Sequence, residues 1–419
     1  MKRILLILLF IHSLIAFGQP FENELPELKK LSPVNIRQLL PEVAVLPPNQ
    51  LPAERLDSVI FDGSGRNRKK YYEYDETENV IRRTDFERDL KSGKWVEIAR
   101  YDFTYNLQNK PASVIFSQWN NQLNIWIRQQ KNETIYNPNG NPVLTVDYGW
   151  NEQMNDWMDY SKVQIVYDIN GNPVVETNFG RNNSTNQWDV ETQKEIGYDR
   201  TGNPVSDIFS VQDEQTKRLK YSTKQTITYG PVQYITTEKY VWNQQLATWI
   251  KEQSSKYVHD SKSNQTPVEF FDGNPQTNEW VNRERYAFSF DDNGNIKTAD
   301  GFQLDPQSDS WQRFQQYNYL YDANKNRISV ESYSCNSGAD DWKGVYKTTY
   351  AFDENDRKTQ EVHYSWNDKT KTWTNGIKND YTYTNSANLQ SNHFYNWNNE
   401  RWNLISSEIF YYQPLNKPH

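Results

Sequence analysis

The residues best placed to bind a ligand in this 419-residue chain are tryptophans that come in pairs. The first member of each pair is followed by Asn and, five or seven residues on, by the second Trp, so that the two rings bracket a polar loop. Indole rings offer large flat apolar faces, which suit stacking on sugar rings. The candidate ligand-binding residues are Trp119, Trp150, Trp242, Trp366 and Trp397. Packing within a sheet would use the same rings, and this alternative stays open.

A second chemical pattern is a repeated turn rich in Asp, Asn and Gly, such as residues 168–172 (DINGN). Clustered carboxylate and amide oxygens suit Ca²⁺. The same residues are also typical of tight turns, and some copies, such as residues 106–109 (NLQN), carry no acid. We therefore predict turns, with no metal site and no cofactor.

Signatures of catalysis do not stand out. The histidines are His12, His259, His363, His393 and His419, and no HExxH, GxSxG or phosphate-binding loop accompanies them. The acidic residues follow the repeats of the chain and mark no unique place. Mild breaks in the repeats occur at Leu219, where other copies have Trp, and at His259, where others have Tyr or Phe. We expect that the protein is not an enzyme and has no catalytic residues.

Composition limits the classes of fold and partner. Hydrophobic residues make up only 36% of the chain, yet 15% of it is aromatic, which predicts rings buried along a thin repetitive fold. The net charge is −8 and no dense basic block occurs, so we expect no nucleic-acid partner. The single cysteine, Cys335, excludes an intrachain disulfide.

Repeats of about 31 residues decide the architecture. Each contains an aromatic residue, here called the anchor, followed by a polar turn. Ten residues before most anchors stands a tryptophan. The anchors are Tyr74, Tyr105, Tyr136, Tyr167, Tyr198, Tyr229, His259, Phe290, Tyr321, Phe352, Tyr383 and, in a last shortened copy, Tyr412.

Each repeat predicts two strands. Rings before the anchor alternate with polar residues, as in Tyr317, Tyr319 and Tyr321, which is typical of one face of a strand. Rings 12 residues after an anchor, such as Tyr148 and Phe179, keep the anchor's periodicity. Short connections require antiparallel neighbours. We predict an all-β fold, an antiparallel meander of about eleven tandem hairpins whose equivalent rings form aromatic ladders.

Whether this sheet closes cannot be read from the repeats. An outer-membrane barrel needs a continuously apolar lipid-facing band, whereas the ring-bearing positions here also include Lys194, Glu284, Gln315 and Asn379. Because strands twist, we expect a twisted or superhelical sheet.

The ends of the chain differ from the repeats. Lys2 and Arg3 precede an apolar run that closes with Ala16-Phe17-Gly18, the pattern of a signal peptide. We expect residues 1–18 to be this signal peptide, 19–55 a proline-rich linker or N-terminal cap, 56–412 the repeats and 413–419 a tail. Secretion or an outer cell-surface location follows, with the periplasm as an alternative. No membrane span is expected in the mature chain.

The recurring YxYDxNGN pattern, seen at Tyr167-Asp168 with Gly171 and at Tyr198-Asp199 with Gly202, resembles the YD (Rhs-type) repeat. The resemblance covers residues 56–412, although the unit here is longer and carries the Trp-bracketed loop in addition. It implies a spiralling sheet of hairpins and brings no catalytic residue. The overall style looks like that of secreted repeat proteins of Bacteroidetes.

These observations favour a secreted or surface-exposed scaffold that contacts a surface glycan or protein through its loops and aromatic rows. One alternative is a carbohydrate-binding protein that uses its Trp and Tyr rows. Another is a shell or appendage of a YD-repeat toxin or enzyme system, with the chemistry on another chain.

Overall fold

The computed structural model describes residues 54–414, apart from residues 64, 231–233, 259–264 and 336–340. The predicted signal peptide, residues 19–53 of the predicted linker, His259 and the last five residues of the tail lie outside the described residues. The described residues form one antiparallel sheet of 24 strands, as predicted for a hairpin meander. Within them, no helix has the length and apolar character needed to cross a membrane.

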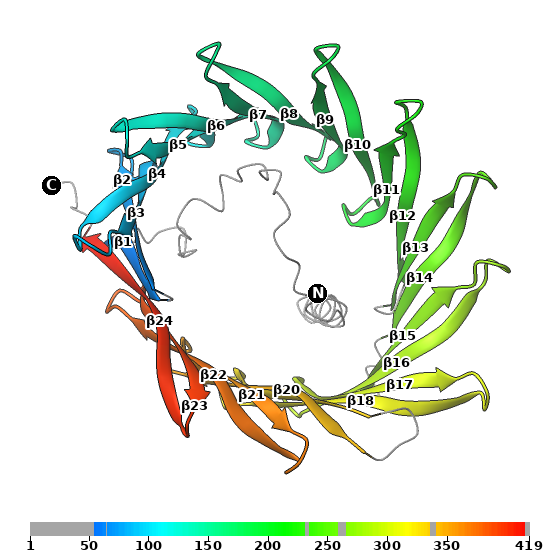
Figure 1. Ribbon diagram of the computed structural model, residues 1–419. Coiled ribbons are helices and arrows are strands. Elements are labelled where there is room, and N and C mark those ends of the chain that lie inside the picture. Colours follow the sequence, from blue (N-terminus) through cyan, green and yellow to red (C-terminus); the bar gives the residue numbers. More distant parts are fainter. Residues whose placement is uncertain (1–53, 64, 231–233, 259–264, 336–340, 415–419) are drawn as a thin grey trace. The chain divides into compact units, whose positions relative to one another are not determined.

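The strands follow one another around the sheet in chain order (Figure 1). They are β1 (Glu54–Gly63), β2 (Arg66–Tyr74), β3 (Val80–Arg88), β4 (Trp95–Tyr105), β5 (Pro111–Asn120), β6 (Ile125–Tyr136), β7 (Pro142–Asn151), β8 (Asp156–Tyr167), β9 (Pro173–Asn182), β10 (Gln187–Tyr198), β11 (Pro204–Gln212), β12 (Leu219–Gly230), β13 (Tyr234–Asn243), β14 (Thr248–Val258), β15 (Gln265–Gly273), β16 (Trp280–Phe290), β17 (Ile296–Asp305), β18 (Ser310–Tyr321), β19 (Arg327–Ser334), β20 (Lys343–Phe352), β21 (Lys358–Asn367), β22 (Thr372–Tyr383), β23 (Leu389–Asn398) and β24 (Arg401–Pro414).

The sheet closes on itself into a barrel, a point that the repeats left open. β1 pairs with β2 on one side and with β24 on the other, in a register that sets Ile60 opposite Ile409. The first hairpin, β1–β2, ends at the first anchor, Tyr74, and the last one ends near Tyr412. Closure removes the exposed edges that an open sheet of this length would carry.

The predicted polar turns hold the short ends of the hairpins. In the turn after β10, Oδ1 of Asp199 accepts hydrogen bonds from the backbone N–H groups of Thr201 and Asn203, at 2.8 and 2.9 Å. Gly202 adopts a φ of +83° there, which costs glycine little. Lys325 and Ala387 occupy the equivalent position in other turns with φ of +70° and +66°. The same turn is therefore kept even where its glycine is missing.

A β-bulge recurs seven residues before every anchor after the first, Tyr74, and decides which way the tryptophans point. Phe116 of β5 pairs with Gln130 of β6, whereas Trp119 pairs with Trp126, so β6 holds one extra residue between the two pairs. Phe116 and Trp119 are three apart on an unbroken strand and lie on opposite faces. The bulged residues, as the register places them, are Ile98, Gln129, Tyr160, Glu191, Ser222, Glu252, Arg283, Phe314, Val345, Gly376 and Ile405.

The bulges give the sheet two faces of different composition. The face of the anchors and of Phe116 is called here the anchor face, and the face of the Trp pairs the tryptophan face. The even spacing between Trp and anchor predicts one shared face, and this is wrong because each bulge inverts the alternation. Rings 12 residues after an anchor also change face: Tyr148 pairs with Lys131, which neighbours the anchor-face residue Asn132.

Most of the best-buried side chains lie on the anchor face, where they alternate between large and small. One cross-strand row runs through Phe288, Ala299, Tyr317 and Ser332, with exposed fractions of 1, 0, 5 and 0%. A second cross-strand row places Gly301 opposite Tyr286, and a Cβ added to Gly301 would lie 2.8 Å from the ring of Tyr286. The predicted aromatic ladders therefore exist in a modified form. In these rows the rings are on every second strand, and a small residue lies on the strand between them.

Candidate functional site

The five candidate tryptophans lie at the long-loop end of the sheet, each opposite the second Trp of its hairpin. The paired rings meet edge to face with their centroids 5.0–5.2 Å apart, a geometry that contributes about 0.5–1.5 kcal/mol beyond buried area. All ten rings are half-buried. The pairs are Trp119–Trp126, Trp150–Trp157, Trp242–Trp249, Trp366–Trp373 and Trp397–Trp402.

Where the two tryptophans are seven residues apart, the loop between them is held by its first asparagine. Oδ1 of Asn120 accepts the backbone N–H groups of Gln122 and Leu123 at 2.9 and 3.0 Å. Asn243 and Asn367 do the same in their own hairpins. Asn124 then takes the left-handed conformation, with a φ of +53°. These loops are thus built to one pattern, whereas the Trp397–Trp402 loop is two residues shorter and has two left-handed residues, Asn399 and Glu400.

Basic side chains lie over the rings of the tryptophan face. Nζ of Lys131 is 4.1 Å from the ring centroid of Tyr148, and the guanidinium of Arg128 is 4.9 Å from that of Trp150. Lys162 lies 4.5 Å from Trp188. A cation over an aromatic face is attracted by the ring's quadrupole, by about 0.5–1 kcal/mol at exposed sites. Rings and cations therefore alternate across this face.

These basic residues were missed in the sequence, although a signal was present. Eight repeats carry Lys or Arg five residues before the anchor position, with the same spacing as the anchors. They are Lys69, Arg100, Lys131, Lys162, Lys224, Arg285, Lys347 and Lys378. Several also form ion pairs within their own strand or with a neighbouring strand, such as Lys131 with Glu133 at 3.0 Å and Lys347 with Glu331 at 2.8 Å.

The tryptophan face is interrupted between β10 and β13. Ser210 stands where Tyr148 and Phe179 stand in earlier repeats, and Leu219 stands where the second Trp is expected. Gln212, opposite Leu219, replaces the first Trp of the pair. Three successive ring positions are thus occupied by smaller or polar side chains. Leu219, a mild irregularity in the sequence, marks this place.

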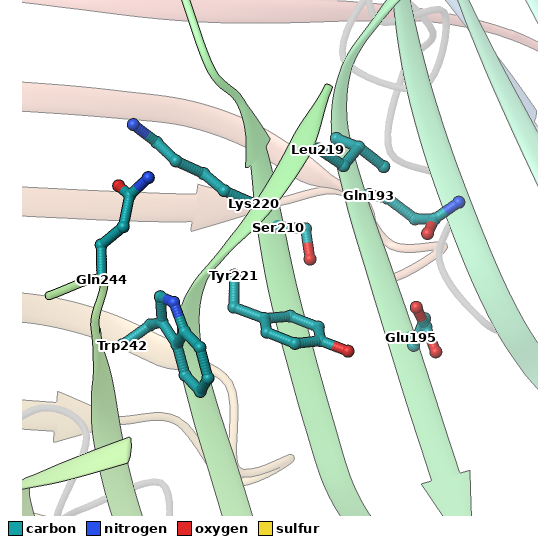
Figure 2. A pocket seen from close by; sticks show the side chains of 8 residues that line it. All are labelled: Gln193, Glu195, Ser210, Leu219, Lys220, Tyr221, Trp242 and Gln244. Carbon is teal, nitrogen blue, oxygen red and sulfur yellow. The ribbon is translucent and has the colours of Figure 1, made fainter. Parts of the chain in front are cut away.

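A hollow of about 400 Å³ occupies the interruption (Figure 2). Tyr221 and Trp242 form one side of it, with ring centroids 5.2 Å apart in an edge-to-face arrangement. Tyr221 is 47% exposed, so part of its ring is open to solvent. Gln193, Glu195 and Gln244 supply polar groups around the rings.

The one cation that lines the hollow is already paired, whereas the Glu195 carboxylate has no cationic partner among the described residues. This cation, Lys220, forms an ion pair with Asp213 at 3.0 Å. The backbone N–H of Thr216 and the ammonium of Lys220 hold the pKa of Asp213 well below its usual range. Gln193 stands five residues before its anchor, where most repeats have Lys or Arg, and it donates a hydrogen bond to Thr177 at 3.2 Å. The hollow therefore lacks the basic residue that eight other repeats carry at this position.

The carboxylates of the polar turns are already engaged. Oδ1 of Asp199 also accepts from the Thr201 hydroxyl, and Oδ2 accepts from the Asn203 amide at 3.1 Å. The Thr201 hydroxyl and the Asn203 backbone N–H lower the pKa of Asp199 to about 2. Across the described ranges, no group of three His, Cys, Asp or Glu side chains could hold a metal ion. The oxygens that suggested Ca²⁺ thus accept hydrogen bonds within the turn.

Comparisons with known proteins do not assign a family. No family model matches the chain, and no curated protein matches it. Among solved structures, a protein of unknown function from Bacteroides fragilis is 16% identical, with a TM-score of 0.26 over 29% of this chain and 89% of its own. TcdB2-TccC3 is 10% identical, with a TM-score of 0.28 over 81% of this chain and 20% of its own. A porin-like protein from Bacteroides uniformis is 10% identical, with a TM-score of 0.20 over 85% of this chain and 96% of its own.

Proposed function

We propose that the mature chain is a non-enzymatic secreted or cell-surface scaffold that binds a ligand at the long-loop end of its sheet. The observation that carries this proposal is the repeated Trp pair, which five hairpins present in the same register. A scaffold that repeats one surface element many times suits a partner that is itself repetitive, such as a polymer or a dense cell surface.

Spacing supports binding of such a partner. Four of the five Trp pairs stand in successive hairpins, Trp119–Trp126 beside Trp150–Trp157 and Trp366–Trp373 beside Trp397–Trp402. Equivalent positions in successive hairpins are two strands apart, or about 10 Å at the usual strand separation. Sites held at a fixed short distance bind a repeating ligand with an avidity that exceeds any single affinity, because later contacts are intramolecular. Weak individual contacts at half-buried rings are then sufficient.

A glycan is the partner that the residue types favour. Indole and phenol rings offer stacking faces, and the neighbouring Asn and Gln side chains offer donors and acceptors for hydroxyl groups. The competing interpretation, a shell component of a YD-repeat toxin or enzyme system, predicts instead that a second chain carrying the chemistry co-purifies with this one.

The test is a pull-down of the purified mature chain against cell-surface glycans and proteins. We expect retention of a glycan or protein partner, and weaker retention by a Trp119→Ala/Trp150→Ala double variant. Trp188→Ala is the matched control, since Trp188 lies at the second Trp position of a hairpin whose first position is Arg181. Equal retention by both variants, or hydrolysis of the partner by the pure protein, would contradict the proposal.

Export is tested separately. We expect the protein to be recovered outside the cytoplasm with Gln19 as its first residue. Recovery of the uncleaved chain from the cytoplasm would contradict the proposed location.

A further inference from the structure

The interruption at β10–β13 differs from the rest of the tryptophan face in a way that suits one class of ligand. Elsewhere a basic side chain covers the rings, as Lys131 covers Tyr148. At the interruption, Ser210, Leu219 and Gln193 replace the two rings and the cation. The two rings that remain on its side, Tyr221 and Trp242, are left beside a hollow.

We propose that this hollow binds a neutral saccharide unit, whose apolar face stacks on Tyr221 and whose hydroxyl groups bond with Gln193, Glu195 and Gln244. The proposal rests on the proposed function, in that it takes the chain to be a ligand-binding scaffold. It goes further in naming a single site and a ligand class for it.

The chemistry of the lining favours this ligand over others. Lys220 is paired with Asp213, so the hollow offers no unpaired cation for a phosphate or a carboxylate. An entirely apolar ligand would leave the Glu195 carboxylate and the Ser210 hydroxyl facing it without a hydrogen bond to the ligand, which costs free energy. A neutral ligand with one apolar face and many hydroxyl groups satisfies both the rings and the polar side chains.

Size agrees with this assignment. About 400 Å³ falls in the range of small-molecule sites, and it accommodates a mono- or disaccharide unit. Gln244, in the loop that follows β13, lines the hollow on the same side as Trp242 (Figure 2), so a longer glycan can extend from the hollow toward the Trp242–Trp249 pair.

The experiment measures binding of neutral trisaccharides of glucose, galactose, mannose, xylose and N-acetylglucosamine to the full mature chain, by saturation-transfer NMR and calorimetry. We expect at least one to bind. Leu219→Trp restores the ring of the repeat and fills the hollow, so we expect affinity to fall at least tenfold. Tyr221→Ala removes the stacking face, and the loss of an aromatic contact corresponds to a drop of about tenfold.

Trp311→Ala is the matched control, because Trp311 is a ring of the same face that lies opposite Leu304 rather than a second Trp, on a strand that does not line the hollow. It should bind like the wild type. Circular dichroism establishes that each variant is folded, and Tyr221→Ala keeps the test valid if Leu219→Trp is unstable.

Two results would overturn the inference. If no trisaccharide binds while the pull-down still retains a partner, the hollow is not a saccharide site and the proposed function stands. The same holds if a trisaccharide binds Leu219→Trp and Tyr221→Ala as tightly as the wild type. An empty pull-down from cell surfaces, in contrast, defeats the proposed function itself, whatever the trisaccharides do.

Discussion

The hydroxyl of Tyr105 donates a hydrogen bond to the backbone carbonyl of Val80 at 2.9 Å. Tyr105 is the last residue of β4, and Val80, 25 residues earlier, is the first residue of β3. Other anchors make the same contact with the start of the previous strand, including Tyr136 with Pro111 at 2.8 Å and Tyr383 with Lys358 at 2.7 Å. Burial accompanies the contact and raises the pKa of Tyr105 to about 12. A tyrosine anchor with this contact therefore ties its turn to the preceding one.

We predict that Tyr105→Phe lowers the free energy of unfolding by about 1 kcal/mol, because it removes one partly buried hydrogen bond and leaves the ring in place. Denaturant titration measures the change. Phe352 is a natural anchor without the hydroxyl, and Arg327 lies 25 residues before it. The reverse substitution, Phe352→Tyr, should therefore stabilise. If neither variant shifts the midpoint, the hydroxyl contributes nothing to stability.

Acid should weaken the turns. The pKa of Asp199 is lowered to about 2 from its ordinary 3.8. A lowered folded-state pKa gives stability that is present above the unfolded-state value and is lost as the pH falls through the folded-state value. We predict that the melting temperature drops between pH 4 and pH 2, since Asp168, Asp291 and Asp353 are shifted in the same direction.

Asp199→Asn isolates one turn in that experiment. Asn137 already serves in an equivalent turn, where its Oδ1 accepts the backbone N–H groups of Asn139 and Asn141 at 3.0 Å. The variant should thus keep the fold and lose slightly less stability than the wild type between pH 4 and pH 2. A steeper loss in the variant would contradict this account of the turn.

Gly344 makes room for one Trp pair. A Cβ at this position would lie 2.5 Å from the ring of Trp366 and 2.6 Å from that of Trp373. We predict that Gly344→Ala displaces this pair and costs about 1–3 kcal/mol, as overpacking does. Near-ultraviolet circular dichroism should report the altered ring contact. Gly149→Ala is the control, because its Cβ would have a nearest neighbour at 4.0 Å and should change neither quantity.

Turn conformation gives a reciprocal pair of variants. Ala387 holds a left-handed φ of +66° where Gly202 has +83°. We expect Ala387→Gly to stabilise and Gly202→Ala to destabilise, each by about 1 kcal/mol, because a Cβ is strained in that conformation. Thermal melts of the two variants should move in opposite directions, and a shift of both in one direction would refute the prediction.

Local chemistry explains how far the sequence predicts this fold. Turns such as 168–172 and alternating rings such as Tyr317 and Tyr319 specify hairpins by themselves, and the 31-residue spacing sets their number. The bulge has no sequence signature, because residues as different as Ile98, Gln129 and Gly376 occupy its position. The face of each tryptophan could therefore not be predicted.

The site was predicted in part for the same reason. The Trp pairs follow from their spacing around a loop, and their contact across the hairpin is a local consequence of it. The hollow beside Tyr221 forms because three neighbouring strands lack a basic residue or an aromatic ring at one place, namely at Gln193, Ser210 and Leu219. An absence of rings carries meaning only once the register between strands is known.

Because β1 pairs with β24 as well as with β2, the sheet has no first or last strand, and every turn joins two strands that are paired on both sides. In a chain of residues 54–414, new ends could be opened at another turn, for example between Asn137 and Gly140, and Glu54 and Pro414, which pair with each other, joined by a short linker, without loss of any strand pairing. We expect such circular permutants to fold, each with the same ring of neighbours in a different chain order. Closure also fixes the number of hairpins, because adding or deleting one would require all the other strands to change their tilt relative to the barrel axis.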